Sequence, residues 1–166
     1  TIEERKNLML TVRAMVAGKL DIDLVACGRH TRYADRVMEY AAPHGIGSRV
    51  RMLHSVPFSD LPALYQMASV FVYPSFYEGF GIPILEALNS RVPVITTRGG
   101  VFPETGGDAC IYVEPESTDE MLHALETVLG DRAAADGMRA RGAAYARNFR
   151  EPVIASNLTA VYRSLL

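Results

Sequence analysis

Apolar residues in this chain gather in short runs that alternate with longer stretches of helical spacing. Five runs are rich in β-branched or aromatic residues and are bounded by glycine, proline or polar residues, which is typical of buried strands: residues 22–27, 50–53, 70–73, 92–97 and 109–113. Strands that alternate with helices form parallel sheets. The pattern therefore predicts an α/β fold, a Rossmann-like parallel sheet with helices on both faces.

The stretches between these runs predict the helices. We expect them at residues 1–18, 33–43, 61–68, 82–89, 117–129 and 131–149, with a last helix from Pro152. Ser59 is expected to cap the helix at 61–68, and Ser117 with Glu120 forms a capping box. No internal repeat or low-complexity tract interrupts the alternation, so we expect residues 1–166 to form one domain.

The composition excludes several classes of function. With 49% hydrophobic and 22% charged residues the chain resembles an ordinary soluble globular protein. Its formal charge of -2 argues against nucleic acid as a partner, and no apolar run approaches the roughly twenty residues of a membrane-spanning helix. There is no signal peptide, and Cys27 and Cys110 fall within apolar runs, which suits buried free thiols of a cytoplasmic protein. No Cys/His cluster has metal-ligand spacing, so we expect no metal ion.

The stretch at residues 70–97 predicts a strand, a glycine-containing loop, a helix and a second strand. Pro83 suits the first turn of the helix at 82–89. The backbone amides of Phe80, Gly81 and Ile82 would therefore lie at a helix N-terminus. Such a terminus has unsatisfied N–H groups and the positive end of the helix dipole, so it favours phosphate or sugar oxygens.

Two carboxylates, Glu78 and Glu86, flank these glycines with seven residues between them. The segment EGFGIPILE resembles the E-x7-E signature of the retaining, GT-B-fold glycosyltransferases of family 4. The resemblance continues upstream in LPALYQMASVFVYPS, and downstream in the family's PV, PE and GDA segments. These segments follow one another in the family's order and cover most of the chain.

The resemblance implies that this chain is the C-terminal, donor-binding half of a two-domain enzyme. An N-terminal acceptor domain would stand before it, and a glycine-ending strand would stand directly before Thr1. That strand is either supplied by residues outside this sequence or cut away with the edge of the domain. The expected donor is a nucleotide diphosphate sugar, GDP- or UDP-linked, with no metal or other cofactor. The RKN start at residues 5–7 resembles members that use mannose donors, so GDP-mannose is the first expectation.

The family's motif positions assign roles to the two glutamates. Glu78, beside Gly79, would lie against the transferred sugar and stabilise an oxocarbenium-like state by its charge. Glu86 would accept hydrogen bonds from the ribose hydroxyls, which suits a carboxylate because two oxygens can accept from vicinal hydroxyls together.

Other expected binding residues lie outside the motif. Lys6 falls on the family's diphosphate-binding lysine and would neutralise the leaving diphosphate as the glycosidic bond breaks. Arg5 provides a second positive charge or is solvated. Met52 and Val56 are weaker candidates for contacts with the nucleobase.

Several alternatives stay open at this level. One is a GT-B relative that acts as an epimerase or phosphorylase, and another is a nucleotide-binding or protein-interaction module without chemistry. The acceptor would belong to polysaccharide or glycolipid synthesis. We expect this polypeptide alone to be inactive, and the enzyme to act in the cytoplasm or at the inner face of the membrane. Residues 131–149 carry four arginines but too weak an apolar face to anchor the protein.

Overall fold

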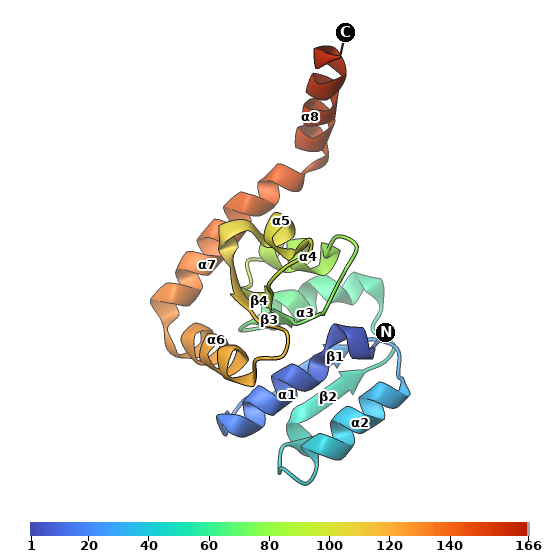
Figure 1. Ribbon diagram of the computed structural model, residues 1–166, viewed down its shortest axis with the longest axis vertical. Coiled ribbons are helices and arrows are strands. Elements are labelled where there is room, and N and C mark those ends of the chain that lie inside the picture. Colours follow the sequence, from blue (N-terminus) through green and yellow to red (C-terminus); the bar gives the residue numbers. More distant parts are fainter. Residues whose placement is uncertain (166) are drawn as a thin grey trace.

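The computed structural model describes residues 1–165 and has an α/β fold, as predicted (Figure 1). Five strands lie in this part of the chain: β1 (Leu24–Cys27), β2 (Val50–Leu53), β3 (Phe71–Tyr73), β4 (Val94–Thr97) and β5 (Cys110–Val113). Strand β1 pairs with β2, while β4 pairs with β3 and β5, and every pairing is parallel. The parallel topology is confirmed. The expected single sheet is instead two sheets, because no ladder joins β1 to β3.

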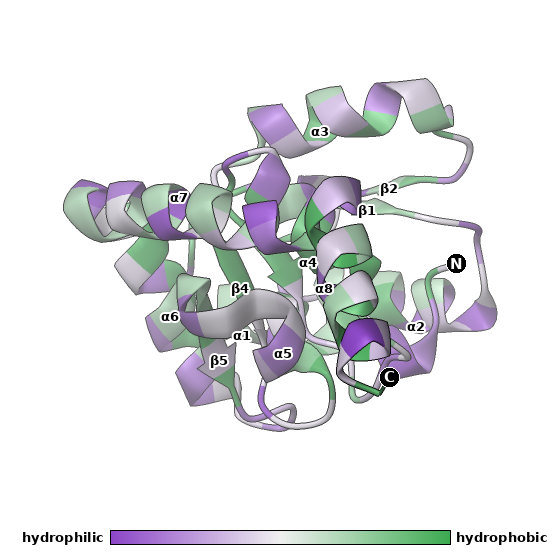
Figure 2. Ribbon diagram, turned by 90° about the horizontal axis from the view of Figure 1, so that it is seen from above, coloured by the Kyte–Doolittle hydropathy of each residue, from purple (hydrophilic) through white to green (hydrophobic). Residues whose placement is uncertain are grey.

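Helices flank both sheets. Their bounds are α1 (Leu8–Ala17), α2 (Arg32–Ala41), α3 (Leu61–Met67), α4 (Ile82–Asn89), α5 (Phe102–Gly106), α6 (Thr118–Gly130), α7 (Arg132–Tyr145) and α8 (Glu151–Ser164). Helix α8 projects from the body of the molecule (Figure 1). In Figure 2 the strands are mostly hydrophobic, whereas helices such as α7 alternate between hydrophobic and hydrophilic residues. None of the helices in residues 1–165 has the length and apolar character needed to cross a membrane.

Helix α1 holds the two sheets together. Its Leu10 and Ala14 pack into a core with residues of β4, β5, α6 and α7. Its Val12 and Met15, both fully buried, pack into a second core with residues of α2 and β2. Different faces of α1 thus bury apolar side chains in the two cores. Burial of apolar surface is the dominant stabilising contribution in folding.

The helix expected from residue 1 is wrong at its start. Residues Glu4–Lys6 form a single 3-10 turn, Asn7 adopts a left-handed conformation with φ 54, and α1 begins only at Leu8. The Asn7 side chain donates a 2.7 Å hydrogen bond to the Pro115 carbonyl. Asparagine tolerates this conformation better than most residues, so a distant contact stabilises the break that places Lys6.

Two capping predictions fare differently. Ser59 lies within a 3-10 turn and its hydroxyl contacts the Asp60 carboxylate, so the expected cap of α3 is wrong. Ser117 does cap α6, accepting from the Glu120 amide at 3.2 Å. The Glu120 carboxylate, however, accepts from the Glu114 amide, so only one half of the capping box forms.

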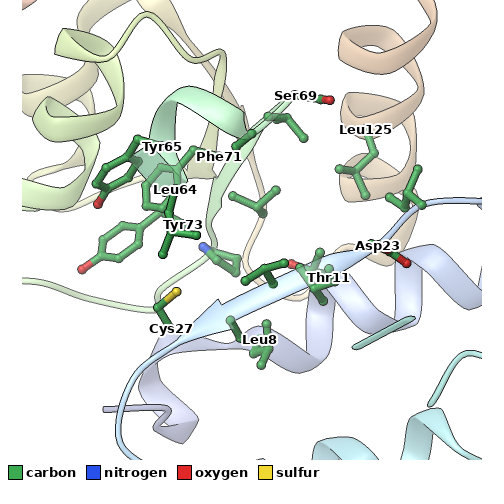
Figure 3. Close-up of a pocket in the computed structure, with 18 of the residues that line it drawn as sticks. Leu8, Thr11, Asp23, Cys27, Leu64, Tyr65, Ser69, Phe71, Tyr73 and Leu125 are labelled. Atoms are coloured by element: carbon green, nitrogen blue, oxygen red, sulfur yellow. The ribbon is translucent and has the colours of Figure 1, made fainter. Parts of the chain in front are cut away.

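A groove of about 660 Å³ separates β1 from β3. Helix α1 contributes Leu8 and Thr11 to its lining, and α3 contributes Leu64 and Tyr65 (Figure 3). The Cys27 side chain lies in this groove and is exposed, so the expectation of a buried thiol is wrong for Cys27. Cys27 lies on the opposite face of β1 from Leu24 and Ala26, which pack against the core shared by α1 and α2, and its own face lines the groove.

Candidate active site

The loop at residues 75–81 follows the carboxyl end of β3, which is where ligands bind in open α/β sheets. Three hydrogen bonds fix it. The Phe76 amide donates to the Arg5 carbonyl at 2.9 Å, the Thr97 hydroxyl donates to the Ser75 carbonyl at 2.5 Å, and the Thr105 hydroxyl donates to the Phe80 carbonyl. The loop is therefore held by the 3-10 turn before α1, by β4 and by α5.

Helix α4 begins where the sequence predicts. Gly81 precedes it with φ 88, a left-handed conformation that favours glycine, and its carbonyl accepts from the Ile84 amide at 2.8 Å. The amides of Phe80, Gly81 and Ile82 thus lie at the helix N-terminus. The side chains of Phe80 and Ile82 are exposed, and a Cβ added at Gly79 would meet no heavy atom within 4 Å. Gly81 between them is buried, so a ligand from solvent would meet this helix start at Phe80 and Ile82.

Glu78 lies between two cations. The Lys6 Nζ donates to Glu78 Oε1 at 2.5 Å, and an Arg5 guanidinium nitrogen donates to the same oxygen at 2.8 Å. The Glu78 side chain is only 12% exposed, whereas those of Arg5 and Lys6 are 33% and 26% exposed. Lys6 also donates to the Tyr73 hydroxyl at 2.7 Å and lies 4.8 Å from the centre of its ring.

These partners set the charge state of Glu78. Burial by itself raises the pKa of the carboxyl group, but the hydrogen bond from Lys6, that from Tyr73 and the Lys6 charge outweigh it, so the pKa of Glu78 lies below its ordinary value. The same carboxylate, after burial, helps to raise the pKa of Tyr73. At neutral pH the cluster therefore contains an ionised carboxylate, two cations and a protonated phenol.

Glu86 lies on the second turn of α4. Its Oε2 accepts a 2.8 Å hydrogen bond from the Tyr65 hydroxyl of α3. The residue is partly exposed, and its other carboxylate oxygen has no hydrogen-bond donor among the described residues. It is available to a ligand.

Met52 and Val56 lie apart from this cluster. Met52 belongs to β2 in the other sheet and packs against the core shared by α1 and α2, while Val56 lies in the loop that follows β2. No hydrogen bond or ion pair among residues 1–165 links this region to Glu78 or Glu86. Their contact with a nucleobase stays a prediction.

Tyr65 and Tyr73 are the site residues that sequence reasoning missed. Tyr73 ends a predicted strand and Tyr65 has the spacing of an inward-facing helical residue, so each is explained by packing alone. The Tyr73 hydroxyl accepts from Lys6, which is 67 residues away in the chain, and the Tyr65 hydroxyl donates to Glu86, which is 21 residues away. The one signal in the sequence is a tyrosine at a position predicted to be buried, because the hydroxyl group of a buried tyrosine usually has a hydrogen-bond partner.

The groove between β1 and β3 is a less suitable site. Lys6, Tyr65 and Tyr73 reach it, but Glu78 and Glu86 do not line it, and most of its lining is aliphatic. Charged groups converge instead at the loop before α4. Within residues 1–165, no group of three or more His, Cys, Asp or Glu residues is arranged to hold a metal ion.

Comparison with known proteins gives the family. The family described as Glycosyl transferases group 1 matches residues 1–149. O-antigen chain mannosyltransferase B from Escherichia coli is 36% identical over 154 residues, which is 90% of this chain and 40% of that protein. The chain thus spans less than half the length of this curated relative.

Solved structures agree with the fold. Sucrose-phosphate synthase from Thermosynechococcus elongatus superposes with a TM-score of 0.84 at 25% identity, covering 98% of this chain and 43% of that one. The C-terminal domain of LpcC, a glycosyl transferase group 1 family protein from Francisella tularensis, gives a TM-score of 0.80 at 23% identity, covering 89% and 80%. The chain belongs to the group 1 family of glycosyl transferases.

Proposed function

We propose that this chain binds the donor, a nucleotide diphosphate sugar, in a retaining glycosyltransferase. One observation carries the proposal: Glu78, Arg5 and Lys6 converge at the loop that leads into the N-terminus of α4. Two cations beside a helix N-terminus suit a diphosphate, because each phosphate oxygen can accept from an N–H group while the positive charges neutralise it.

The leaving diphosphate gains negative charge as the glycosidic bond breaks. Lys6 and Arg5 would stabilise that charge, with the α4 amides, in the role that a metal ion fills elsewhere. Both cations contact one oxygen of Glu78. A bound diphosphate would take over part of this contact, and the ionised Glu78 would then face the sugar and stabilise positive charge at its anomeric carbon.

Glu86 supplies the nucleoside end of the site. Its free carboxylate oxygen would accept hydrogen bonds from the ribose hydroxyls. Similarity to an O-antigen chain mannosyltransferase favours mannose and therefore GDP-mannose as donor, with UDP-sugars next. The acceptor would be a hydroxyl group of a surface polysaccharide or glycolipid precursor.

The acceptor side of the reaction would lie on a second domain. The curated relative is more than twice as long as the matched region, and transfer requires donor and acceptor to meet in one site. We therefore propose an N-terminal acceptor domain in the complete enzyme, acting in the cytoplasm or at the inner face of the membrane. The polypeptide of residues 1–166 would bind donor nucleotides with little or no transfer.

Calorimetric titration with GDP, UDP and ADP tests the proposal. We expect one nucleoside diphosphate to bind, and Glu86→Ala to weaken its binding by about 1.5 to 3 kcal/mol, the range for a hydrogen bond to a charged group. Glu126→Ala is the matched control, because Glu126 is an exposed glutamate of α6. Absence of binding by all three nucleotides at millimolar concentration would contradict the proposal, as would equal losses in the two variants.

A further inference from the structure

A hydrogen bond between Tyr65 and Glu86 joins helix α3 to helix α4. Tyr65 lies on α3 and Glu86 on α4, and the Tyr65 hydroxyl donates to Glu86 Oε2 at 2.8 Å. A strand and the loop at residues 75–81 separate them in the chain. The contact therefore depends on the packing of α3 against the sheet.

Packing fixes the tyrosine ring. It lies edge-on to Phe71 of β3, with ring centres 5.2 Å apart, and Phe71 stacks on Tyr73 at 5.8 Å. Tyr65 also packs against the core that contains Ile84 and Leu88 of α4. Because Phe71 and this core restrict the rotation of the Tyr65 ring, its hydroxyl group has a defined position.

The hydroxyl group can act only as a donor to the carboxylate. Burial raises the pKa of Tyr65, and the hydrogen bond to Glu86 and the Glu86 charge raise it further, so the phenol is protonated at neutral pH. A hydrogen bond from the phenol to one oxygen restricts the rotation of the carboxylate and leaves the other oxygen to accept from a ligand.

We propose that Tyr65 is a positioning residue that orients Glu86 for the vicinal hydroxyl groups of the donor ribose. This inference rests on the proposed function. Without the phenol, the glutamate side chain regains its rotamers, and part of the binding free energy is lost in ordering it. The loss falls only on ligands that carry the ribose hydroxyl groups, because Tyr65 acts through Glu86.

The test compares a ribonucleotide with its 2′,3′-dideoxy counterpart in wild type and Tyr65→Phe. GDP and 2′,3′-dideoxy-GDP are the probes, or the corresponding pair for whichever base binds. We expect Tyr65→Phe to weaken ribonucleotide binding about 5- to 20-fold, at or below the lower end of the range for a lost hydrogen bond to a charged group, because Tyr65 acts on the ligand only through Glu86. Binding of the dideoxynucleotide should change less than about twofold, since no hydroxyl groups remain for Glu86 to accept from.

Tyr112→Phe is the matched control. The Tyr112 hydroxyl donates to the carbonyls of Gly107 and Phe102, away from the site, so its removal should leave the preference for ribonucleotide unchanged. Glu86→Gln and the double variant with Tyr65→Phe provide a second measurement. If Tyr65 acts through Glu86, Tyr65→Phe has little further effect on ribonucleotide binding in the Glu86→Gln background.

The outcomes separate the two proposals. Equal weakening of both nucleotides by Tyr65→Phe, or no weakening of either, would overturn the role of Tyr65 while leaving donor binding intact. A ribonucleotide that binds no better than its dideoxy form to wild type would overturn it as well. Failure of wild type to bind any nucleotide overturns the proposed function, and this inference with it.

Discussion

Glu78 is the residue on which the site depends. It is ionised because two cations and a phenol surround it, and it lies on a loop held by hydrogen bonds to three elements. The cations come from the start of the chain and the carboxylate from its middle, so the cluster exists only in the folded state. Its charge balance therefore links the site to the stability of the protein.

This linkage gives a pH prediction. The pKa of Glu78 is lower in the folded chain than in the unfolded chain, so the unfolded chain binds the proton first as pH falls. The stabilisation is fully present above the unfolded pKa of about 4.3 and is lost as pH falls through the lower folded value. Between about pH 6 and pH 3 the melting temperature of wild type should therefore fall more steeply than that of Glu78→Gln. Parallel curves, measured by circular dichroism, would show that the ion pairs contribute no net stability.

At the scale of elements, the strand, loop and helix around the motif are what the sequence predicts best. Local signals agree there: an apolar run ends at Pro74, glycines follow, and Pro83 stands in the first turn of α4. The failures are elements set by distant contacts. Asn7 ends the 3-10 turn with the help of Pro115, which is 108 residues away, and no local propensity encodes that bond.

Gly81 gives a prediction at this scale. Its φ of 88 is a conformation that costs other residues about 1 to 2 kcal/mol, and an added Cβ would meet the Ile84 side chain at 3.4 Å. Gly81→Ala should lower the free energy of unfolding by about that amount and should weaken nucleotide binding by moving the α4 amides.

Gly130→Ala is the control for chemical denaturation of the Gly81 variant. Gly130 ends α6, has no positive φ, and its added Cβ would meet nothing within 4 Å. Alanine there should leave stability unchanged or raise it slightly, because alanine is the better helix former. If Gly81→Ala unfolds at the same denaturant concentration as Gly130→Ala, the strained start of α4 is not a constraint on this site.

At the scale of the whole molecule, the divided sheet is the feature that periodicity could not predict. Apolar runs reveal strands but not which edges pair, and β1 and β3 both leave an edge open to the groove. The exposure of Cys27 and of Val25, which is 47% exposed, follows from this gap. The site residues were reachable mainly through the family resemblance, whereas their partners Tyr65 and Tyr73 required the three-dimensional structure.

Amide hydrogen exchange tests whether these edges are open. The Gly28 amide donates to the Leu53 carbonyl of β2, and the Phe71 amide donates to the Pro93 carbonyl just before β4. Successive amides of a strand point in opposite directions. The amides of Val25, Cys27 and Val72 should therefore face the groove and exchange much faster than that of Phe71. Strong protection in residues 1–166 alone would contradict an open groove.

The most direct test of donor binding at the loop before α4 is a titration of the isotope-labelled chain with GDP-mannose, followed residue by residue in amide NMR spectra. We predict that the largest shifts occur at Gly79, Phe80, Gly81 and Ile82, with smaller ones around Lys6 and Glu86. Largest shifts in the groove, at β1 and α3, or no shifts at millimolar GDP-mannose and none with UDP-glucose, would contradict the placement of the donor at Glu78 and the α4 N-terminus.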